Sequence, residues 1–474
     1  MRFQAPSAAL LGLKEREREM LSDGGSFMRD AHCHLICSAR NGTDMMRLGR
    51  RYVAALQLTV VTVIGIYTLI HIKISSHPST VDLAEYRKLP FRFNITTTQG
   101  QNITIEEIMT NPHFDSLEQR VNFTPSKEQK LILSVDTGHF SDNLQGCPEW
   151  NCALTTDMND FDKADVVMIR SSEAISEKKR KPEQYIVFFT QESPVHTYVE
   201  VPDENYFNLS LSYRHDSIGA SPYGYTAKLA PESRKPSGSV INGTLVRGKS
   251  KAIAWFVSHC STPSSREKLV AQLQKYIPVD IYGDCGNLNC KRGDTCEDML
   301  DNDYHFYITF ENSICDDYIT EKLWNQGYQR NVIPIVLRRS VVEPYVPPNS
   351  FIAVDDYDNL ENLAAELYRI MNDKALYASY FEWRRDYHVI FLNGQVHDSA
   401  ERPWGFCQLC RLSHMNPRPS VVMKNFTKSW KNSCENDGEF VFQLLKKTNP
   451  SNSIRNRQSL RLKGKIVESA FAIH

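Results

Sequence analysis

The sequence predicts an α/β protein in which buried parallel strands alternate with helices. Short, uninterrupted apolar runs recur between residues 131 and 337, as expected for strands buried on both faces of a sheet. Segments with helical spacing lie between several of these runs, and this alternation favours β-α-β units. The 474 residues are 41% hydrophobic and 23% charged, which is typical of a globular chain with room for two or three domains. The net charge of -1 gives no positive field for nucleic-acid binding, so no nucleic-acid partner is expected.

Seven strands and three helices follow from these patterns. A possible N-cap at Thr262, with Pro263 at the first position, begins the first helix. Gly327 follows the end of the second helix, and leucines at helical spacing mark the third. The predicted strands are 131–135, 166–169, 186–189, 253–257, 279–282, 306–310 and 333–337, and the helices are 263–276, 317–326 and 360–371.

A membrane anchor is predicted at residues 52–72. These 21 residues contain no Asp, Glu, Lys or Arg. As a helix they would span about 32 Å, against roughly 30 Å of bilayer hydrocarbon. Arg47, Arg50 and Arg51 precede the segment, which places the N-terminus in the cytosol by the positive-inside tendency. We therefore expect a single-pass type II membrane protein whose larger part faces the secretory lumen.

Glycosylation sequons and cysteines on the expected lumenal side agree with that compartment. Ten cysteines follow the anchor, and an even number in an oxidising compartment predicts disulfides. Spacing does not determine their pairing, and local Cys147–Cys152 and Cys407–Cys410 bridges are the expectation. The alternative, that the Cys407–Cys410 pair is half of a zinc site, lacks a second pair of ligands. The sequon asparagines after the anchor are Asn94, Asn102, Asn122, Asn208, Asn242 and Asn425.

The chain is expected to divide into six segments. A polar stretch after the anchor suggests an extended stem, and a Pro-, Gly- and Ser-rich linker at residues 230–250 suggests a boundary between two domains. The basic end of the chain is interpreted as a mobile tail. The predicted segments are a cytosolic segment (1–51), the anchor (52–72), the stem (73–129), an N-terminal domain (130–245), a C-terminal domain (246–415) and the tail (416–474).

Candidate chemistry lies where predicted strands end, because open α/β sheets bind ligands beyond the carboxyl ends of their strands. Glu192 follows one strand, and Arg266 lies in the first turn of the helix after another. Arg266 and Lys322 could hold a diphosphate without a metal, since helix N-termini and guanidinium groups favour phosphate oxygens. The alternative is that these charges are solvated surface groups. A third strand precedes Glu311 and Asn312, and the helix after it carries Tyr318, Glu321, Lys322 and Asn325 on one predicted face.

These motifs resemble the α1,3-fucosyltransferase family. The similarity covers about residues 185–411 in collinear order, and the FENS and DYITEK motifs make it specific. The stem, the cytosolic segment and the tail lie outside it. The matching motifs are ESPVHTY, NLSLSYRHDS, PYG, AWFVSHC, VDIYGDCG, FYITFENSICDDYITEKLWNQ, VIPIVL, YVPPNSFIAVDDY, YFEWRRDY and FCQLC.

The resemblance implies a Golgi enzyme of the GT-B type, in which two Rossmann-like domains face a cleft. Such an enzyme transfers L-fucose from GDP-fucose to a GlcNAc hydroxyl of an N-glycan, with inversion. The family pattern places the general base at Glu192. It implies no obligatory cofactor or metal, with a divalent cation such as Mn²⁺ at most stimulatory. The donor-binding positions that it implies are Arg266, Tyr318, Glu321 and Lys322, beside Glu311 and Asn312.

Departures from the family pattern concern the acceptor. Members that act on Lewis-type acceptors usually carry a His-His motif after one N-terminal strand, whereas Arg170–Glu173 stands there in this chain. Asn331, Arg338 and Arg339 also replace small residues at the edges of a later strand. We therefore expect the core GlcNAc of N-glycans as the acceptor, with Lewis-type or LacdiNAc acceptors as the alternative. A catalytically inactive, lectin-like lumenal protein is a further alternative.

Overall fold

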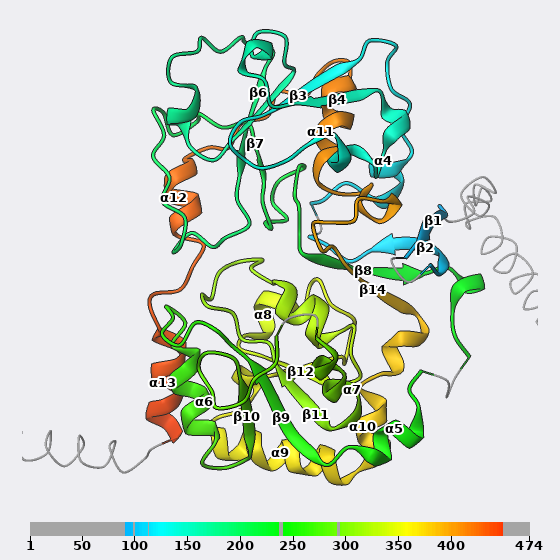
Figure 1. Cartoon of the computed structure of the whole chain (residues 1–474), viewed down its shortest axis with the longest axis vertical. Helices are drawn as coiled ribbons and strands as arrows, with labels where there is room; N and C mark the ends of the chain where they lie inside the picture. Colours follow the sequence, from blue (N-terminus) through cyan, green and yellow to red (C-terminus); the bar gives the residue numbers. More distant parts are fainter. Residues whose placement is uncertain (1–90, 98–99, 112, 237–239, 292–293, 449–474) are drawn as a thin grey trace, which may run out of the picture. The chain divides into compact units, whose positions relative to one another are not determined.

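The computed structural model describes residues 91–97, 100–111, 113–236, 240–291 and 294–448, all within one compact unit (Figure 1). The predicted anchor at 52–72 and the cytosolic segment lie outside these residues. Within the described ranges, no helix is both long enough and apolar enough to cross a membrane. The α/β class is confirmed, because two parallel sheets with flanking helices form most of the described chain.

The first parallel sheet contains the predicted strands of the N-terminal half. Its strand order is β4-β3-β5-β6-β7, and every neighbouring pair is parallel. The chain begins near the middle of this sheet and winds outward in both directions, so the order reverses between β3 and β5. The strands are β3 (Lys130–Ser134), β4 (Cys152–Thr155), β5 (Val166–Ile169), β6 (Tyr185–Phe189) and β7 (Leu209–Leu211).

The second parallel sheet has the order β10-β9-β11-β12-β13 and contains the other four predicted strands. Three helices far apart in the sequence pack together beside it (Figure 1), and the buried Leu269, Leu363 and Val441 come from these helices. The strands are β9 (Lys251–Phe256), β10 (Val279–Tyr282), β11 (Tyr304–Ile308), β12 (Ile333–Val336) and β13 (Ile352–Ala353), and the helices are α6 (Arg266–Leu273), α9 (Leu360–Asn372) and α13 (Glu439–Thr448).

An antiparallel sheet that the sequence did not predict has the order β1-β2-β8-β14. Two of its strands lie in the segment interpreted as an extended stem, so that interpretation is wrong for this part of the chain. Ile103, Ile105 and Ile108 of the second strand are buried, and this apolar face explains why the segment packs. The strands are β1 (Phe93–Thr96), β2 (Asn102–Ile108), β8 (Gly224–Leu229) and β14 (Tyr387–Phe391).

The linker and tail predictions also need correction. Part of the 230–250 stretch forms a helix, and the described part of the tail, residues 416–448, contains two further helices. Phe426 and Trp430 of this tail are buried against Phe188 of β6, so burial of aromatic surface holds the segment in place. The remaining helices are α4 (Leu117–Val121), α5 (Gly243–Gly248), α7 (Met299–Asn302), α8 (Arg339–Val342), α10 (Lys374–Ser379), α11 (Gly405–His414) and α12 (Phe426–Lys431).

Two of the predicted helices begin later than expected. Ser265 has a left-handed backbone (φ 54°), so α6 begins at Arg266 rather than at Pro263. Asp317 is also left-handed (φ 61°), and its carboxylate accepts hydrogen bonds from the His215 backbone N–H and the Tyr345 hydroxyl. A left-handed residue interrupts a helix, because the next turn cannot continue from it. The segment therefore becomes helical only in the π-helix η8 (Lys322–Gly327).

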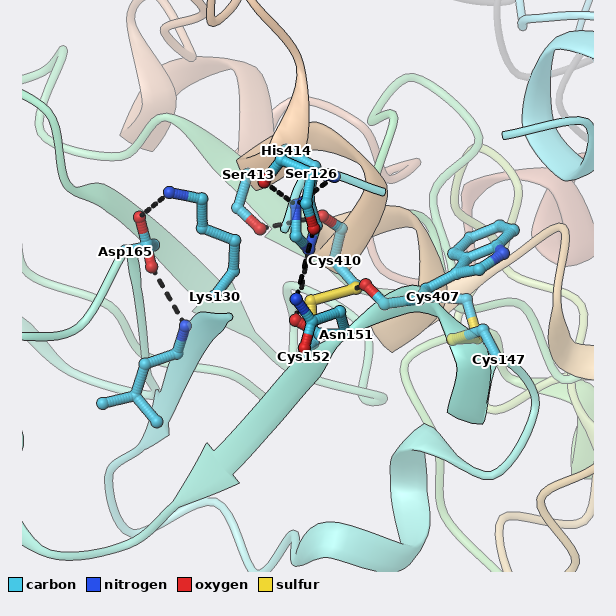
Figure 2. The surroundings of a disulfide bond; sticks show 12 residues. Ser126, Lys130, Cys147, Asn151, Cys152, Asp165, Cys407, Cys410, Ser413 and His414 are labelled. Carbon is cyan, nitrogen blue, oxygen red and sulfur yellow. Dashed lines mark hydrogen bonds and ion pairs between the residues drawn. A yellow bond between two sulfur atoms is a disulfide. The ribbon is translucent and has the colours of Figure 1, made fainter. Parts of the chain in front are cut away.

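All ten described cysteines form disulfides, but the local pairing predicted for four of them is wrong. Cys147 pairs with Cys407, and Cys152 pairs with Cys410 (Figure 2). Cys407 and Cys410 are one helical turn apart on α11. Each forms its disulfide with a cysteine that packs in the same hydrophobic cluster as the first parallel sheet. Sequence distance misled the prediction, because folding brings together residues about 260 positions apart. The other three bridges are Cys260–Cys285, Cys290–Cys296 and Cys315–Cys434.

The Cys315–Cys434 bridge should contribute far more to stability than the short Cys290–Cys296 bridge. The Cys147–Cys407 bridge is not a suitable comparison, because Cys152–Cys410 closes nearly the same loop. In the chain-entropy relation the contribution grows with loop length, giving about 5 kcal/mol for the long loop and about 2 kcal/mol for the short one. Replacing both cysteines of each bridge by serine and measuring urea unfolding should reveal this difference in the free energy of unfolding. Equal losses from the two double variants would contradict the loop-length explanation.

Candidate active site

A cavity of about 300 Å³ gathers six of the seven residues predicted for catalysis and donor binding. Its walls come from the loops after β6, β9, β10 and β11, so it lies beyond the carboxyl ends of strands from both parallel sheets. In the second sheet the strand order reverses between β9 and β11, where open α/β sheets generally bind ligands. The predicted residues that line the cavity are Glu192, Arg266, Asn312, Tyr318, Glu321 and Lys322.

The loops after β9 and β11 are joined by hydrogen bonds at the base of the cavity. The Ser264 N–H donates to the Asn312 carbonyl at 2.8 Å, and the Ser264 hydroxyl donates to the Glu311 carbonyl at 2.7 Å. Arg266 donates from Nη1 to the Phe310 carbonyl at 2.5 Å. These contacts hold the start of α6 against the end of β11, so that Arg266 and Lys322 line the same cavity.

Arg266 is a buried cation, with only 2% of its surface exposed. Its guanidinium carbon lies 5.7 Å from the centre of the Trp255 ring, and burial lowers the pKa of Arg266. The guanidinium nevertheless remains charged, because the ordinary pKa of arginine is far above neutral. A buried charge is costly without a partner, so this position favours an anionic ligand.

Lys322 belongs to a network with Glu311 and Thr320. Its Nζ lies 3.0 Å from Glu311 Oε2 and 3.4 Å from Glu321 Oε1, and it donates to the Thr320 hydroxyl at 2.8 Å. Burial acts to lower the pKa of Lys322, but the carboxylates of Glu311 and Glu321 outweigh it, so the pKa is raised and the amine stays charged. The longest of these contacts, to Glu321, is the one that an incoming anion would most easily replace.

Glu311, which the resemblance placed beside the donor-binding residues, does not line the cavity. Its Oε1 accepts hydrogen bonds from the Thr320 N–H at 2.8 Å and the Thr320 hydroxyl at 2.9 Å, and its Oε2 faces Lys322. Burial raises the pKa of Glu311, while the neighbouring Lys322 acts in the opposite direction. We interpret Glu311 as a residue that positions Lys322.

Glu192 is the exposed carboxylate that faces this set from the other sheet. The Tyr318 hydroxyl donates to Glu192 Oε2 at 3.1 Å. Burial, and then the nearby Glu311, raise the pKa of Tyr318, so its hydroxyl stays a donor. A buried hydrogen bond between the Ser193 and Ser313 hydroxyls, at 2.9 Å, joins the same two loops. Glu192 is thus held at the cavity wall with one carboxylate oxygen oriented by Tyr318.

Sequence reasoning missed several residues of the cavity. The Tyr223 hydroxyl donates to the Gln191 carbonyl at 2.7 Å, and Tyr307 contributes a buried ring from β11. Gly283 has a φ of 94°, and a Cβ there would lie 2.6 Å from the Val257 carbonyl oxygen. Thr320, inside the DYITEK motif, was also overlooked. Nothing distinguished these residues in the sequence except their position at or just after a predicted strand or within a motif.

The predicted glycosylation sites differ in accessibility. Five of the six asparagines are exposed, whereas Asn208 is partly buried at the start of β7. The Asn208 amide nitrogen donates to the Val421 carbonyl at 2.8 Å, and its oxygen accepts from the Ile186 N–H at 2.7 Å. A glycan on Asn208 would have to share the amide nitrogen with this contact to Val421. The exposed positions are Asn94, Asn102, Asn122, Asn242 and Asn425.

Cys152, Cys410 and His414 have donor atoms close enough together to hold a metal ion (Figure 2). The sulfurs of Cys152 and Cys410 are joined in a disulfide, so neither provides a thiolate. His414 hydrogen-bonds through Nδ1 to the Ser126 hydroxyl at 2.8 Å. The zinc interpretation of the Cys407–Cys410 pair is therefore excluded, since both cysteines are in disulfides.

The arrangement has the parts that group transfer from a phosphorylated donor requires. Arg266 and Lys322 provide positive charge for an anionic leaving group. Glu192 provides a carboxylate for proton transfer from the opposite side of the cavity. Together with the two parallel sheets, this site defines a group-transfer enzyme of the α/β class.

Comparisons with known proteins identify the family. Residues 246–430 match the model of glycosyltransferase family 10 (fucosyltransferase), C-terminal part, and residues 127–224 match the fucosyltransferase N-terminal model. The α-(1,3)-fucosyltransferase fut-1 of Caenorhabditis elegans is 50% identical over 351 residues, which cover 74% of this chain and 80% of that protein. The chain therefore belongs to the α1,3-fucosyltransferases of glycosyltransferase family 10.

Two further relatives carry names that refer to different acceptors. The glycoprotein 3-α-L-fucosyltransferase A of Drosophila melanogaster is 38% identical, over 50% of this chain and 48% of that protein. The human 4-galactosyl-N-acetylglucosaminide 3-α-L-fucosyltransferase FUT6 is 35% identical, over 49% of this chain and 65% of that protein. The chain is thus about equally similar to both relatives.

Proposed function

We propose that this enzyme transfers L-fucose from GDP-fucose, in α1,3 linkage and with inversion, to a GlcNAc of glycoprotein N-glycans. The observation that carries the proposal is the single cavity in which Glu192 faces Arg266 and Lys322. The carboxylate comes from the loop after β6 and the two cations come from the second sheet, as expected of a GT-B enzyme. Donor and acceptor would then meet between the two sheets.

The proposed reaction is a direct displacement at C1 of fucose. The acceptor oxygen forms the new bond to C1 as the bond from C1 to the diphosphate oxygen breaks, and the acceptor proton moves to Glu192. General-base catalysis of this kind typically contributes about 10²–10⁴-fold to the rate. Arg266 and Lys322 stabilise the negative charge that develops on GDP. Inversion follows, because attack and departure occur on opposite faces of one carbon.

The proposed binding of GDP-fucose does not require a metal ion. Arg266 is buried and Lys322 stays charged, so two fixed cations are available for the diphosphate. Asn312 and Glu321 also line the cavity, where they would contact fucose or ribose hydroxyls. A divalent cation such as Mn²⁺ would at most stimulate the reaction by screening the phosphates.

We propose the core GlcNAc as the acceptor, since Arg170–Glu173 stands where Lewis-type enzymes usually have a His-His motif. The alternatives are a Lewis-type or LacdiNAc acceptor. We further propose a location in the Golgi membrane, with residues 52–72 as a type II anchor.

An acceptor panel tests the function. The full-length protein in detergent, given GDP-fucose, should fucosylate an N-glycan with an unmodified chitobiose core, and mass spectrometry with linkage analysis should place the fucose α1,3 on the innermost GlcNAc. Transfer only to lactosamine or to LacdiNAc would replace the core proposal with the matching alternative. GDP or glycan binding without transfer to any acceptor would indicate an inactive, lectin-like protein.

A further inference from the structure

A second cavity, also of about 300 Å³, adjoins the first and shares Tyr223 and Glu321 with it. Loops after β3, β6 and β14 form its walls, together with the start of α11. Gln191, the neighbour of Glu192 in the chain, also lines it. A molecule in this cavity would therefore lie close to the proposed base, and Glu321 separates it from Lys322 of the first cavity.

The lining suits a saccharide. His139 packs against Phe189 and Phe406, with ring centres 4.6 Å and 4.9 Å apart, and all three line the cavity. Burial lowers the pKa of His139 to about 4, so its ring is neutral near pH 7. Gln191 and Asn393 add amide groups to this aromatic surface. Pyranose rings offer apolar faces for such rings and hydroxyls for such amides.

The two cavities differ in charge. The first contains Arg266 and Lys322, whereas none of the described residues that line the second is Lys or Arg. Its carboxylates are those of Glu321 and Glu401. Two nearby guanidinium groups lie outside its lining: Arg402 pairs with Glu149 at 2.9 Å, and Arg170 donates to the Thr137 carbonyl at 3.4 Å.

His397, the hydrogen-bond partner of Glu401, is surrounded by acidic side chains. The Phe140 N–H donates to Asn143 Oδ1 at 2.9 Å, so the amide nitrogen of Asn143 faces His397 Nε2 at 3.0 Å and donates to it. His397 then donates from Nδ1 to Glu401 Oε2 at 2.7 Å, so a single imidazole faces the carboxylates of Glu401, Asp142 and Asp398. Glu401, and then Asp142 and Asp398, raise the pKa of His397, which reflects the acidic surroundings.

We propose that the second cavity holds the sugar next to the accepting GlcNAc and selects neutral glycans over those that carry a sulfate or carboxylate on that sugar. Glu401 is the specificity-determining residue, because its carboxylate accepts hydrogen bonds from neutral hydroxyls and repels an anionic substituent. This inference rests on the proposed fucosyl transfer.

The test compares two acceptors that differ in a single charge. The best acceptor of the panel and the same glycan with one sulfate ester on the sugar next to the accepting GlcNAc are assayed at low salt. The wild-type kcat/KM should be at least ~10-fold higher for the neutral glycan, and Glu401→Gln should reduce this ratio at least ~3-fold. Added salt should also reduce the ratio, since it screens the repulsion.

Control variants separate charge from folding. Glu401→Asp keeps the carboxylate and should keep the preference for the neutral glycan. Glu177→Gln removes an exposed carboxylate outside both cavities and should leave the ratio unchanged. The affinity for GDP and the melting temperature of each variant show whether the fold and the donor cavity are intact.

Two results would overturn the inference. One is equal wild-type kcat/KM for the two glycans, and the other is an unchanged ratio in a folded Glu401→Gln variant. Either leaves the proposed function standing, because fucose is still transferred. If the wild-type protein transfers fucose to no acceptor of the panel, the proposed function fails first, and this inference fails with it.

Discussion

Replacing Glu192 by glutamine is expected to lower turnover at least ~100-fold while leaving the affinity for GDP unchanged. Glutamine keeps the shape of the side chain and can still accept the hydrogen bond from Tyr318, so the cavity should retain its geometry. Only the ability to take the acceptor proton is lost. Steady-state assays with saturating GDP-fucose give kcat, and calorimetric titration with GDP gives the affinity.

The matched control for this prediction is Glu177→Gln, which makes the same chemical change at an exposed position outside the cavity. Its turnover should equal that of the wild type. Near-normal turnover of Glu192→Gln would refute the base assignment. A large loss of GDP affinity in that variant would instead indicate that Glu192 organises the donor site.

Replacing Lys322 by alanine should weaken GDP binding by roughly 10- to 100-fold, the factor expected for a lost hydrogen bond between charged groups. The ammonium is held by Glu311 and Thr320 at the cavity wall, close to where the diphosphate is proposed to lie. Truncation also leaves Glu311 without its cationic partner, so some loss of thermal stability should accompany the effect. Calorimetric titration with GDP measures the affinity.

Two variants make the Lys322 result interpretable. Lys322→Arg keeps the positive charge and the pairing with Glu311, so it should retain much of the affinity. Lys275→Ala removes an exposed lysine of α6's C-terminal flank and should have no effect. An unchanged dissociation constant for GDP in a folded Lys322→Ala variant would rule out its role in donor binding.

Much of the site followed from local sequence. Continuous apolar runs such as 166–169 and 186–189 became strands of parallel sheets, because such strands are covered on both faces and need no polar alternation. Polar residues just after those strands then belonged at one edge of each sheet. These patterns predict that Arg266 and Glu192 lie at a ligand site, and both residues line the first cavity.

The errors arose where long-range contacts overruled local pattern. The helix expected from Asp317 begins at Lys322, because the Asp317 carboxylate is held by His215 and Tyr345, from distant parts of the chain. The stem prediction failed because β2 finds its partner strand β8 about 120 residues later. Neither contact has a local signal.

Local sequence patterns were enough to predict the class of fold, the family and six residues that line the first cavity, because strand periodicity and motif chemistry are encoded locally. The folded chain was needed to show that Cys147 pairs with Cys407, that Glu311 supports Lys322, and that a cavity whose described lining has no lysine or arginine adjoins the cavity of Glu192. These features depend on which distant segments meet. The packing of the whole chain determines which segments meet, because each contact contributes little and the fold depends on their total free energy.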